Sequence, residues 1–597
     1  MKYLFLFLPL FLILAREANS SLFASSDFLV SQTVDYVYDS VGNSTVTHRF
    51  ALTNNTSFSY ASSYQLRLQG LSSAPKNLVA SDSRGPLNAS LQPLPPDGYQ
   101  ATVILSRPAV GKNQTLNFQL SYNSDPAKHN GQIWEIILPR LVSPQPVDSY
   151  RVNLTVPDSF GQPAFISPLP ATIQQSTYSF TPSQLANTPV VASFGQLQNY
   201  AFTLKYHLSN TSSKTTGATI ALPPDTAYQR VIYSAILPPP QNVTVDPDGN
   251  WIASYSLSPK SQLDITASGQ ARLLSQPNTS FSQNFSPLLQ PDKHWPVDNP
   301  DLTDLASSLK TPQSIYTFVV NHLTYDYSRL TRESASIRRG ALAAFENPQS
   351  SLCTDFTDLF ITLARAAGIP AREIQGFAYS TDPRLQPLSL AGDVLHSWAQ
   401  YWDPTRRVWA SVDPTWGQTT GADYLTQFDF SHFAFVIHGL SSTSPLPPTD
   451  VDVKFSPYID PPAPPLDISW IRPSQFFPLF PIPTTLRVTN NQPWALYRLP
   501  IEFLTSSLIS DAIPPFAKVD FPATLRLPLS PSFQTRYYTA TVGSRRVTYN
   551  IEARYFLAWH LTLGLSISFI VIAGGLIAYR AWSLHLQRHH PKYPLRG

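Results

Sequence analysis

One stretch of the chain, residues 350–416, constrains the fold more than any other because a helical pattern is followed directly by strand patterns. Apolar residues recur at helical spacing over 352–367, and the Gly-Ile-Pro at 368–370 ends that run. Strand-forming residues then dominate 372–379 and 396–412. The stretch therefore predicts an α+β domain within the chain.

The only cysteine of the chain, Cys353, falls in the first turn of the predicted helix, which Ser350 or Ser351 is expected to cap. Unpaired backbone N–H groups and the positive end of the helix dipole favour a thiolate there. The same N–H groups can hold a developing oxyanion. The alternative is a small buried apolar residue, which is the usual role of a free cysteine. Position alone leaves both interpretations open.

A histidine and an aspartate lie farther along in strand-like segments, at His396 and Asp413. Residues 403–406 read as a four-residue hairpin loop, so we expect Trp402 to pair with Arg407. In this register His396 lies opposite Asp413, with Cβ atoms about 4.5–5.5 Å apart. The carboxylate would then orient the imidazole, leaving the other ring nitrogen for the thiol. An ordinary surface His–Asp pair is the alternative, and a slip of one residue would separate the two side chains.

Three blocks of this stretch, in order, resemble the transglutaminase-like superfamily. The blocks are C-x-D-x-x-x-L-x-x-x-L-A-R-A-A-G-I-P-A-R-x-x-x-G-F from Cys353 to Phe377, then His396-Ser-Trp398, then Val412-Asp413-Pro414-Thr415. The resemblance covers roughly a quarter of the chain. It implies a papain-like core in which Cys353 is the nucleophile, His396 the general base and acid, and Asp413 the orienting residue.

Several other residues could take part in the site, but each also has a structural interpretation. His322, on a helix expected to start with Thr311 as cap and Pro312 as first residue, is interpreted as a packing residue. Asp355 and Asp358 are interpreted as acids of the first helical turns. The resemblance also implies an aromatic residue that donates a hydrogen bond to the oxyanion. The candidates are Trp295, Tyr325 and Tyr327, and the alternative for each is a role in core packing.

Composition indicates an exported, mainly β protein. The chain has 597 residues, including 57 prolines, but only 13% charged residues and a net charge of +3. Such a small net charge indicates no strongly electrostatic partner, and no nucleic-acid motif is present. A single cysteine excludes an intrachain disulfide, and an exposed thiol outside the cell risks oxidation, so its presence favours use.

Alternating apolar and polar residues between turn residues predict β-sandwich domains on both sides of the α+β domain. The expected order along the chain is a β-sandwich at 21–160, a second β-rich domain at 161–290, a transglutaminase-like catalytic domain at 291–440, a proline-rich linker at 441–465 and a small β-sandwich at 466–554.

Both ends of the chain carry apolar segments. Residues 1–20 read as a secretory signal peptide, with an uncleaved anchor as the alternative. Residues 555–579 read as a transmembrane helix because they are long enough and lack charged residues after Arg554. The tail at 580–597 is basic, so we expect it in the cytoplasm and the bulk of the protein outside the cell membrane.

The sequence therefore predicts a membrane-anchored extracytoplasmic cysteine enzyme that acts on protein or peptide amides, by acyl transfer or hydrolysis. The chemistry requires no cofactor and no metal, no nucleic acid is expected as a partner, and the oligomeric state is not predicted. The alternative is a catalytically silent module in a surface adhesion or assembly protein. It is motivated by Ser351 and Leu352, which stand where the family usually has glycine or glycine and an acidic residue, because Leu352 would crowd the thiol.

Overall fold

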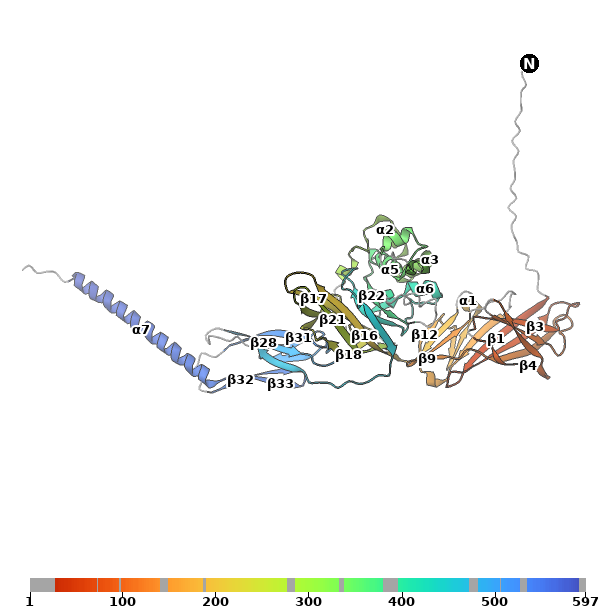
Figure 1. Cartoon of the computed structure of the whole chain (residues 1–597), viewed down its shortest axis with the longest axis horizontal. Coiled ribbons are helices and arrows are strands. Elements are labelled where there is room, and N and C mark those ends of the chain that lie inside the picture. The colour runs from red at the N-terminus through yellow and green to blue at the C-terminus, as the bar shows by residue number, and fades with distance from the viewer. Residues whose placement is uncertain are drawn as a thin grey trace, which may run out of the picture. The chain divides into compact units, whose positions relative to one another are not determined.

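A computed structural model of the chain confirms a mainly β, multidomain architecture with one α+β region (Figure 1). The described chain divides into two compact units, the first made chiefly of residues before Ser193 and the second chiefly of residues from Ser193 onward. The predicted signal peptide lies outside the described residues. The structure describes residues 27–71, 73–95, 98–139, 149–185, 189–275, 277, 285–331, 338–379, 396–471, 481–504, 506–526 and 534–589.

The first unit is built on an eight-stranded sheet whose strands bury every second side chain, as the alternation in the sequence predicts. The structure differs from the predicted boundary at residue 160, because strands after it pair with β11 and the unit continues to Ala192. In spatial order the strands are β13 (Thr172–Gln174), β14 (Thr177–Phe180), β11 (Ser149–Thr155), β1 (Phe28–Tyr38), β2 (Ser44–Asn54), β8 (Thr115–Asn123), β4 (Lys76–Asp82) and β5 (Gly85–Leu87).

Two smaller sheets and two short helices complete the N-terminal part of the chain. One sheet has the order β12 (Pro163–Ser167), β15 (Val190–Phe194), β10 (Ile133–Leu138) and β9 (Lys128–Asn130), and the other β3 (Ser63–Gln69), β7 (Gly98–Ile104) and β6 (Ala89–Leu94). The helices are η1 (Asp158–Phe160) and α1 (Pro182–Leu185).

A second β domain opens the second unit, and it recruits a strand from the predicted proline-rich linker. The prediction of a linker throughout 441–465 is wrong, since β26 (Asp450–Phe455) pairs with β16 (Leu197–Asn210). The alternating Asp-Val-Asp-Val-Lys-Phe sequence of β26 fits a half-buried edge strand. The two sheets of this domain are β18 (Gln229–Leu237), β21 (Ser261–Leu274), β16 and β26, and β17 (Thr216–Leu222), β20 (Trp251–Leu257) and β19 (Asn242–Val245).

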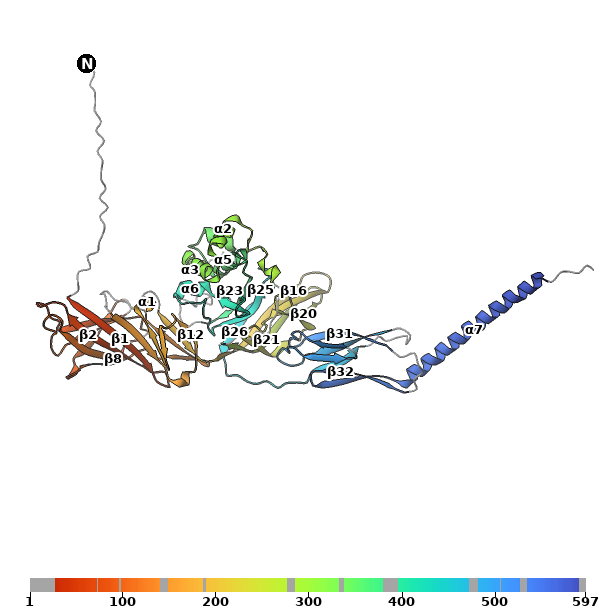
Figure 2. The ribbon, with the colours of Figure 1, turned by 180° about the vertical axis from the view of Figure 1, so that it is seen from behind.

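The α+β region places a helical layer against an antiparallel sheet. In both views α2, α3 and α5 lie together beside the sheet (Figures 1 and 2), and α5 contacts β22 and β23. Thr311 caps α3 as predicted, accepting a hydrogen bond from the Ser314 N–H at 3.1 Å. The helices are η2 (Ser286–Leu289), α2 (Pro300–Leu309), α3 (Pro312–His322), η3 (Tyr327–Thr331), α4 (Ala341–Glu346), α5 (Cys353–Ala366) and α6 (Pro414–Thr420), and the sheet order is β24 (Val408–Val412), β23 (His396–Asp403), β22 (Ala371–Ala378) and β25 (His432–His438).

The C-terminal part consists of two small sheets followed by one long helix, α7 (Ala553–His589). Within α7, His560–Arg588 forms a 29-residue span that is long and apolar enough to cross a membrane. Its large apolar side chains, such as Phe569 and Val571, are exposed. The sheets are β27 (Asp467–Ile471), β28 (Ile482–Thr489) and β31 (Lys518–Leu525), and β30 (Ser506–Ile509), β29 (Pro500–Phe503), β32 (Arg536–Val542) and β33 (Arg545–Ile551).

The edge strand β25 of the α+β sheet is completed by side chains of the second β domain. The Asn250 side chain accepts from the Ile437 N–H and donates to the Ile437 C=O, both at 2.7 Å. Gln229 makes the same pair of bonds to Ala434, at 2.8 and 3.0 Å. Both amides are buried, so they replace the neighbouring strand that an edge would otherwise lack.

We predict that Asn250→Ala opens β25 locally, because it leaves the buried N–H and C=O of Ile437 without partners. Each of the two unmade bonds costs about 1–3 kcal/mol, so together they raise the open population by about 30-fold or more. Hydrogen–deuterium exchange of peptides covering 432–438 measures this change. Asn117→Ala, at an exposed position of β8, is the matched control, and unchanged exchange in β25 of the Asn250 variant would contradict the role of this side chain.

Candidate active site

Cys353 lies in the first turn of α5, as predicted, and is its first residue, but the cap of the helix differs from the prediction. Neither Ser350 nor Ser351 caps it. Leu352 occupies the N-cap position, and its backbone N–H donates to the Asp355 carboxylate at 2.8 Å. An acid three residues into the helix thus performs half of a capping box without a polar residue at the cap. The first-turn role predicted for Asp355 is confirmed.

The hairpin that carries the histidine has a different register from the predicted one. Trp402 pairs with Trp409, not with Arg407. Arg407 adopts a left-handed conformation, with φ of 53°, and therefore closes the loop instead of starting the strand. The difference amounts to two residues, and side chains on a strand repeat every two residues, so His396 and Asp413 remain on one face.

Asp413 follows the end of β24 at Val412 and caps the next helix, α6, rather than lying within a strand as predicted. One carboxylate oxygen, Oδ1, accepts from the N–H groups of Thr415 and Trp416, at 2.9 and 3.0 Å. This fixes the other oxygen, Oδ2, 2.8 Å from Nε2 of His396. Burial opposes ionisation of the carboxyl group, but the charge of His396 outweighs it and lowers the pKa of Asp413.

His396 is buried, and both the Asp413 carboxylate and Cys353 affect the charge of its ring. Burial disfavours the charged ring, but Asp413 and then the Cys353 thiol favour it, and together they raise the pKa of His396 to about 9. Its Nδ1 atom has no hydrogen-bond partner among the described residues. The bond from Nε2 to Asp413 fixes the tautomer, so Nδ1 is the nitrogen available to exchange a proton with Cys353.

A second histidine, His432 at the start of β25, contacts the same carboxylate and was not predicted from the sequence. Its Nε2 lies 3.2 Å from Oδ2 of Asp413, and its Nδ1 lies 2.7 Å from Oδ1 of Asp429. Of its two partners, only Asp429 is near His432 in the sequence, and a spacing of three residues between Asp and His does not indicate a functional site. Since His432 reaches Asp413 from a different strand, its role follows from the fold.

His396, Asp413 and His432 also offer three metal-ligating atoms within 4.8 Å of one another. The N···O distances of 2.8 and 3.2 Å to the shared carboxylate oxygen are within the range of direct hydrogen bonds between the side chains themselves. The arrangement is therefore that of two imidazoles hydrogen-bonded to one carboxylate.

The three aromatic candidates for an oxyanion donor differ in what their polar atoms do. The indole N–H of Trp295 donates to Asp358 at 2.8 Å, so Trp295 is a core residue. The side chain of Tyr327 is 44% exposed. Tyr325 pairs with Ser351 in an isolated bridge, and its buried hydroxyl has no partner among the described residues. Burial and then Cys353 raise the pKa of Tyr325, so this hydroxyl stays protonated and able to donate.

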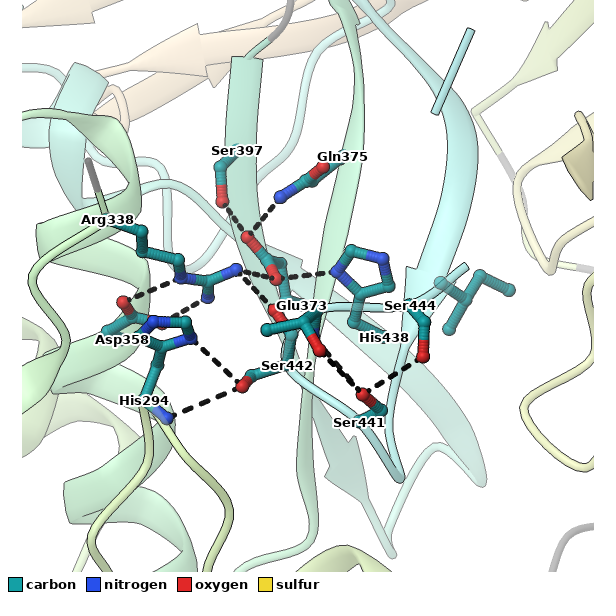
Figure 3. A network of polar contacts seen from close by, with 12 residues as sticks. His294, Arg338, Asp358, Glu373, Gln375, Ser397, His438, Ser441, Ser442 and Ser444 are labelled. Carbon is teal, nitrogen blue, oxygen red and sulfur yellow. Dashed lines mark hydrogen bonds and ion pairs between the residues drawn. The ribbon is translucent and has the colours of Figure 1, made fainter. Parts of the chain in front are cut away.

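A buried network of charges connects helix α5 to the sheet (Figure 3). Arg338 donates to Asp358 of α5 at 2.9 Å and to Glu373 of β22 at 2.8 Å. Ser397 and His438 also bond Glu373, at 2.7 and 2.8 Å. Burial opposes ionisation of Glu373, but Arg338 outweighs it and lowers the pKa of Glu373. The prediction that Asp358 is a first-turn acid is wrong, because the residue lies beyond the first turn of α5. Its bond to Arg338 anchors the helix instead.

Comparison with known families confirms the resemblance drawn from the sequence. Residues 301–414 match the sequence profile of the transglutaminase-like superfamily. The matched segment contains Cys353, His396 and Asp413, and it ends before His432. The α+β region is therefore a transglutaminase-like core within a longer chain.

Two of the matching solved structures are distant from this chain, and a search of curated proteins found no match. A candidate cysteine protease from Cytophaga hutchinsonii shares 15% identity over 44% of this chain and 87% of its own, with a TM-score of 0.30. The periplasmic domain of TgpA from Pseudomonas aeruginosa shares 16% identity over 37% of this chain and 91% of its own, with a TM-score of 0.20. Scores this low do not support an argument about this chain.

We predict that Arg338→Leu destabilises the core by about 3–5 kcal/mol, because it leaves Asp358 and Glu373 buried without their shared cation. Pulse proteolysis in urea, with cleavage inside 301–438 followed by mass spectrometry, measures the free energy of unfolding of the core. Arg67→Leu, at an exposed position of β3, is the control. Equal urea midpoints for the two variants would show that the network does not stabilise the core.

The pKa values of the two histidines predict a stability that falls as pH rises. Both His396 and His432 have a pKa raised to about 9 from an ordinary value of 6.5. The folded state therefore binds protons that the unfolded state has released, so the added stability is complete below about pH 6.5 and is lost as pH rises toward about 9. The loss is on the order of a few kcal/mol. The same proteolysis assay across this window measures it, and a flat profile would contradict the protonated state.

Proposed function

We propose that the chain is a membrane-anchored extracytoplasmic cysteine enzyme of the transglutaminase-like type, acting on the carbonyl of protein or peptide amides. The observation that carries the proposal is the buried 2.8 Å bond between His396 and Asp413, next to a cysteine at the start of a helix. The first helical turn favours a thiolate, and the raised pKa of His396 favours an imidazolium beside it.

In the first half of the reaction the Cys353 thiolate attacks the amide carbon, and the carbonyl electron pair moves onto its oxygen. Backbone N–H groups of the first turn of α5 and the Tyr325 hydroxyl are suited to hold that oxyanion. His396 then gives its Nδ1 proton to the leaving nitrogen, the C–N bond breaks, and a thioester joins the acyl group to Cys353.

In the second half water or an amine attacks the thioester. His396 takes a proton from the attacking group, the C–S bond breaks, and Cys353 leaves as the thiolate. Water gives hydrolysis and an amine gives cross-linking. Asp413 stabilises the imidazolium in both halves without taking its proton.

The span His560–Arg588 of α7 supports the membrane anchor. The residues near and after its end include four basic ones and no acidic one, at Arg580, Arg588, Lys592 and Arg596. Positive residues remain on the cytoplasmic side, which puts Cys353 and the β domains outside.

A catalytically silent module for surface adhesion or assembly is the second candidate function. It is favoured by the surroundings of the thiol, since Leu352 and Cys353 are 6% and 7% exposed, respectively. A substrate carbonyl has to reach a sulfur atom that is buried and preceded by a bulky residue. The two candidates differ in the reactivity of this thiol.

We predict that Cys353 in the full-length protein reacts with iodoacetamide rapidly at pH 6, well below the ordinary thiol pKa of about 8.5. His396→Ala should slow the reaction at this pH by about tenfold or more, because the thiolate loses its cation. Mass spectrometry of the peptide containing Cys353 measures the rate. Slow labelling with an ordinary thiol profile in both proteins would favour the silent module.

The substrate class requires a separate screen. Peptide amides, with and without an added primary amine, are offered to the full-length protein, and products are identified by mass. Cys353→Ala should abolish turnover, and His396→Ala should lower it by about 10³-fold or more. Release of ammonia or amine alone identifies hydrolysis, and a product joined to the added amine identifies acyl transfer.

A further inference from the structure

His432 is held by two carboxylates, one on each side of its ring. Its side chain is buried, with Nε2 3.2 Å from Oδ2 of Asp413 and Nδ1 2.7 Å from Oδ1 of Asp429. An ionised carboxylate can only accept a hydrogen bond, so both ring nitrogens must carry a proton. His432 is therefore an imidazolium ion when both aspartates are charged.

Asp429 is itself held by two further hydrogen bonds, so four side chains are linked in a row. Its Oδ1 also accepts from the Ser431 N–H at 2.9 Å, and its Oδ2 accepts from the Tyr424 hydroxyl at 3.1 Å. The series runs from His396 to Asp413, His432 and Asp429. The two rings at the shared carboxylate have their centroids 5.5 Å apart.

We propose that His432 is a positioning residue of the catalytic triad: it holds Oδ2 of Asp413 toward His396 and, as a cation, offsets part of the negative charge that Asp413 presents to His396. The inference rests on the proposed function. It adds to the triad a charged residue that lies outside the segment matched by the family profile.

The surroundings of His432 argue against a packing role alone. Aromatic rings enclose it, with centroids 4.5 Å away for Trp416 and Phe428 and 4.9 Å for Trp398. An apolar side chain would fill such a space without the cost of burying a charge. The titratable groups that face the ring are Asp413 before α6, Asp429 in the loop before β25, His396 on β23 and, through Asp429, Tyr424.

The chemical consequence concerns how tightly His396 holds its proton. A carboxylate alone beside His396 would stabilise the imidazolium so strongly that it gives its proton to the leaving nitrogen less readily. A second cation close by repels the proton on His396 and restores this transfer. Removing the charge of His432 should therefore make His396 more basic.

Alkylation of Cys353 by iodoacetate across pH tests the inference in the full-length protein. The carboxylate of this reagent is attracted to the imidazolium of the ion pair, so the rate falls at high pH as His396 loses its proton. This fall is the upper limb of the pH–rate profile. We expect His432→Gln, and independently Asp429→Asn, to shift the midpoint of the upper limb to higher pH by about one pH unit. That shift is a roughly tenfold lower proton concentration at the midpoint.

His207→Gln, an exposed histidine paired with Asp264, is the matched control and should leave the limb in place. The inference is overturned if the fall in labelling rate at high pH stays in place, or moves to lower pH, in Asp429→Asn. The same result in His432→Gln overturns it too, provided that this variant folds. A merely structural role would lower the amplitude of labelling without moving the limb. A wild-type profile with no upper limb contradicts the proposed function and the inference with it.

Discussion

The core depends on one buried carboxylate, that of Asp413, which accepts hydrogen bonds from the Thr415 and Trp416 N–H groups and from two imidazoles. A charge removed from water costs several kcal/mol unless every lone pair finds a donor. The backbone N–H groups come from the start of α6, so the helix positions the carboxylate independently of either imidazole. Only Asp413 itself, which is buried, lies between β24 and α6.

The helix that begins with Cys353 is held by a second buried network of charges, separate from the one around Asp413. Arg338 joins α5 to β22 through Asp358 and Glu373, and α5 also contacts β23, the strand that carries His396. The helix that places Cys353 is thus fixed by ion pairs as well as by apolar packing. Removing one member would leave the others buried and unpaired, at a cost of about 3–5 kcal/mol.

Local sequence patterns predicted those parts of the site whose structure depends on neighbouring residues in the sequence. The helix α5 and its end just before Gly368 followed from apolar spacing and a glycine stop, and the Thr311 cap followed from its position before a proline. The hairpin register did not, because a left-handed Arg407 is not marked by its residue type. Strand β26 and the contact of His432 with Asp413 depend on partners far along the chain, which no local pattern specifies.

The second β domain connects to the site through the strand that carries His432. Phe433, the next residue, packs with Phe202 of β16, with centroids 5.5 Å apart, while Gln229 and Asn250 satisfy the backbone of Ala434 and Ile437. His432 therefore faces Asp413, and the next residue of β25, Phe433, faces the β domain. Because β25 is an edge strand within the α+β sheet, its position depends on these contacts from outside the sheet. The β domain is then part of what keeps His432 against Asp413, and the transglutaminase-like core is not structurally independent of it.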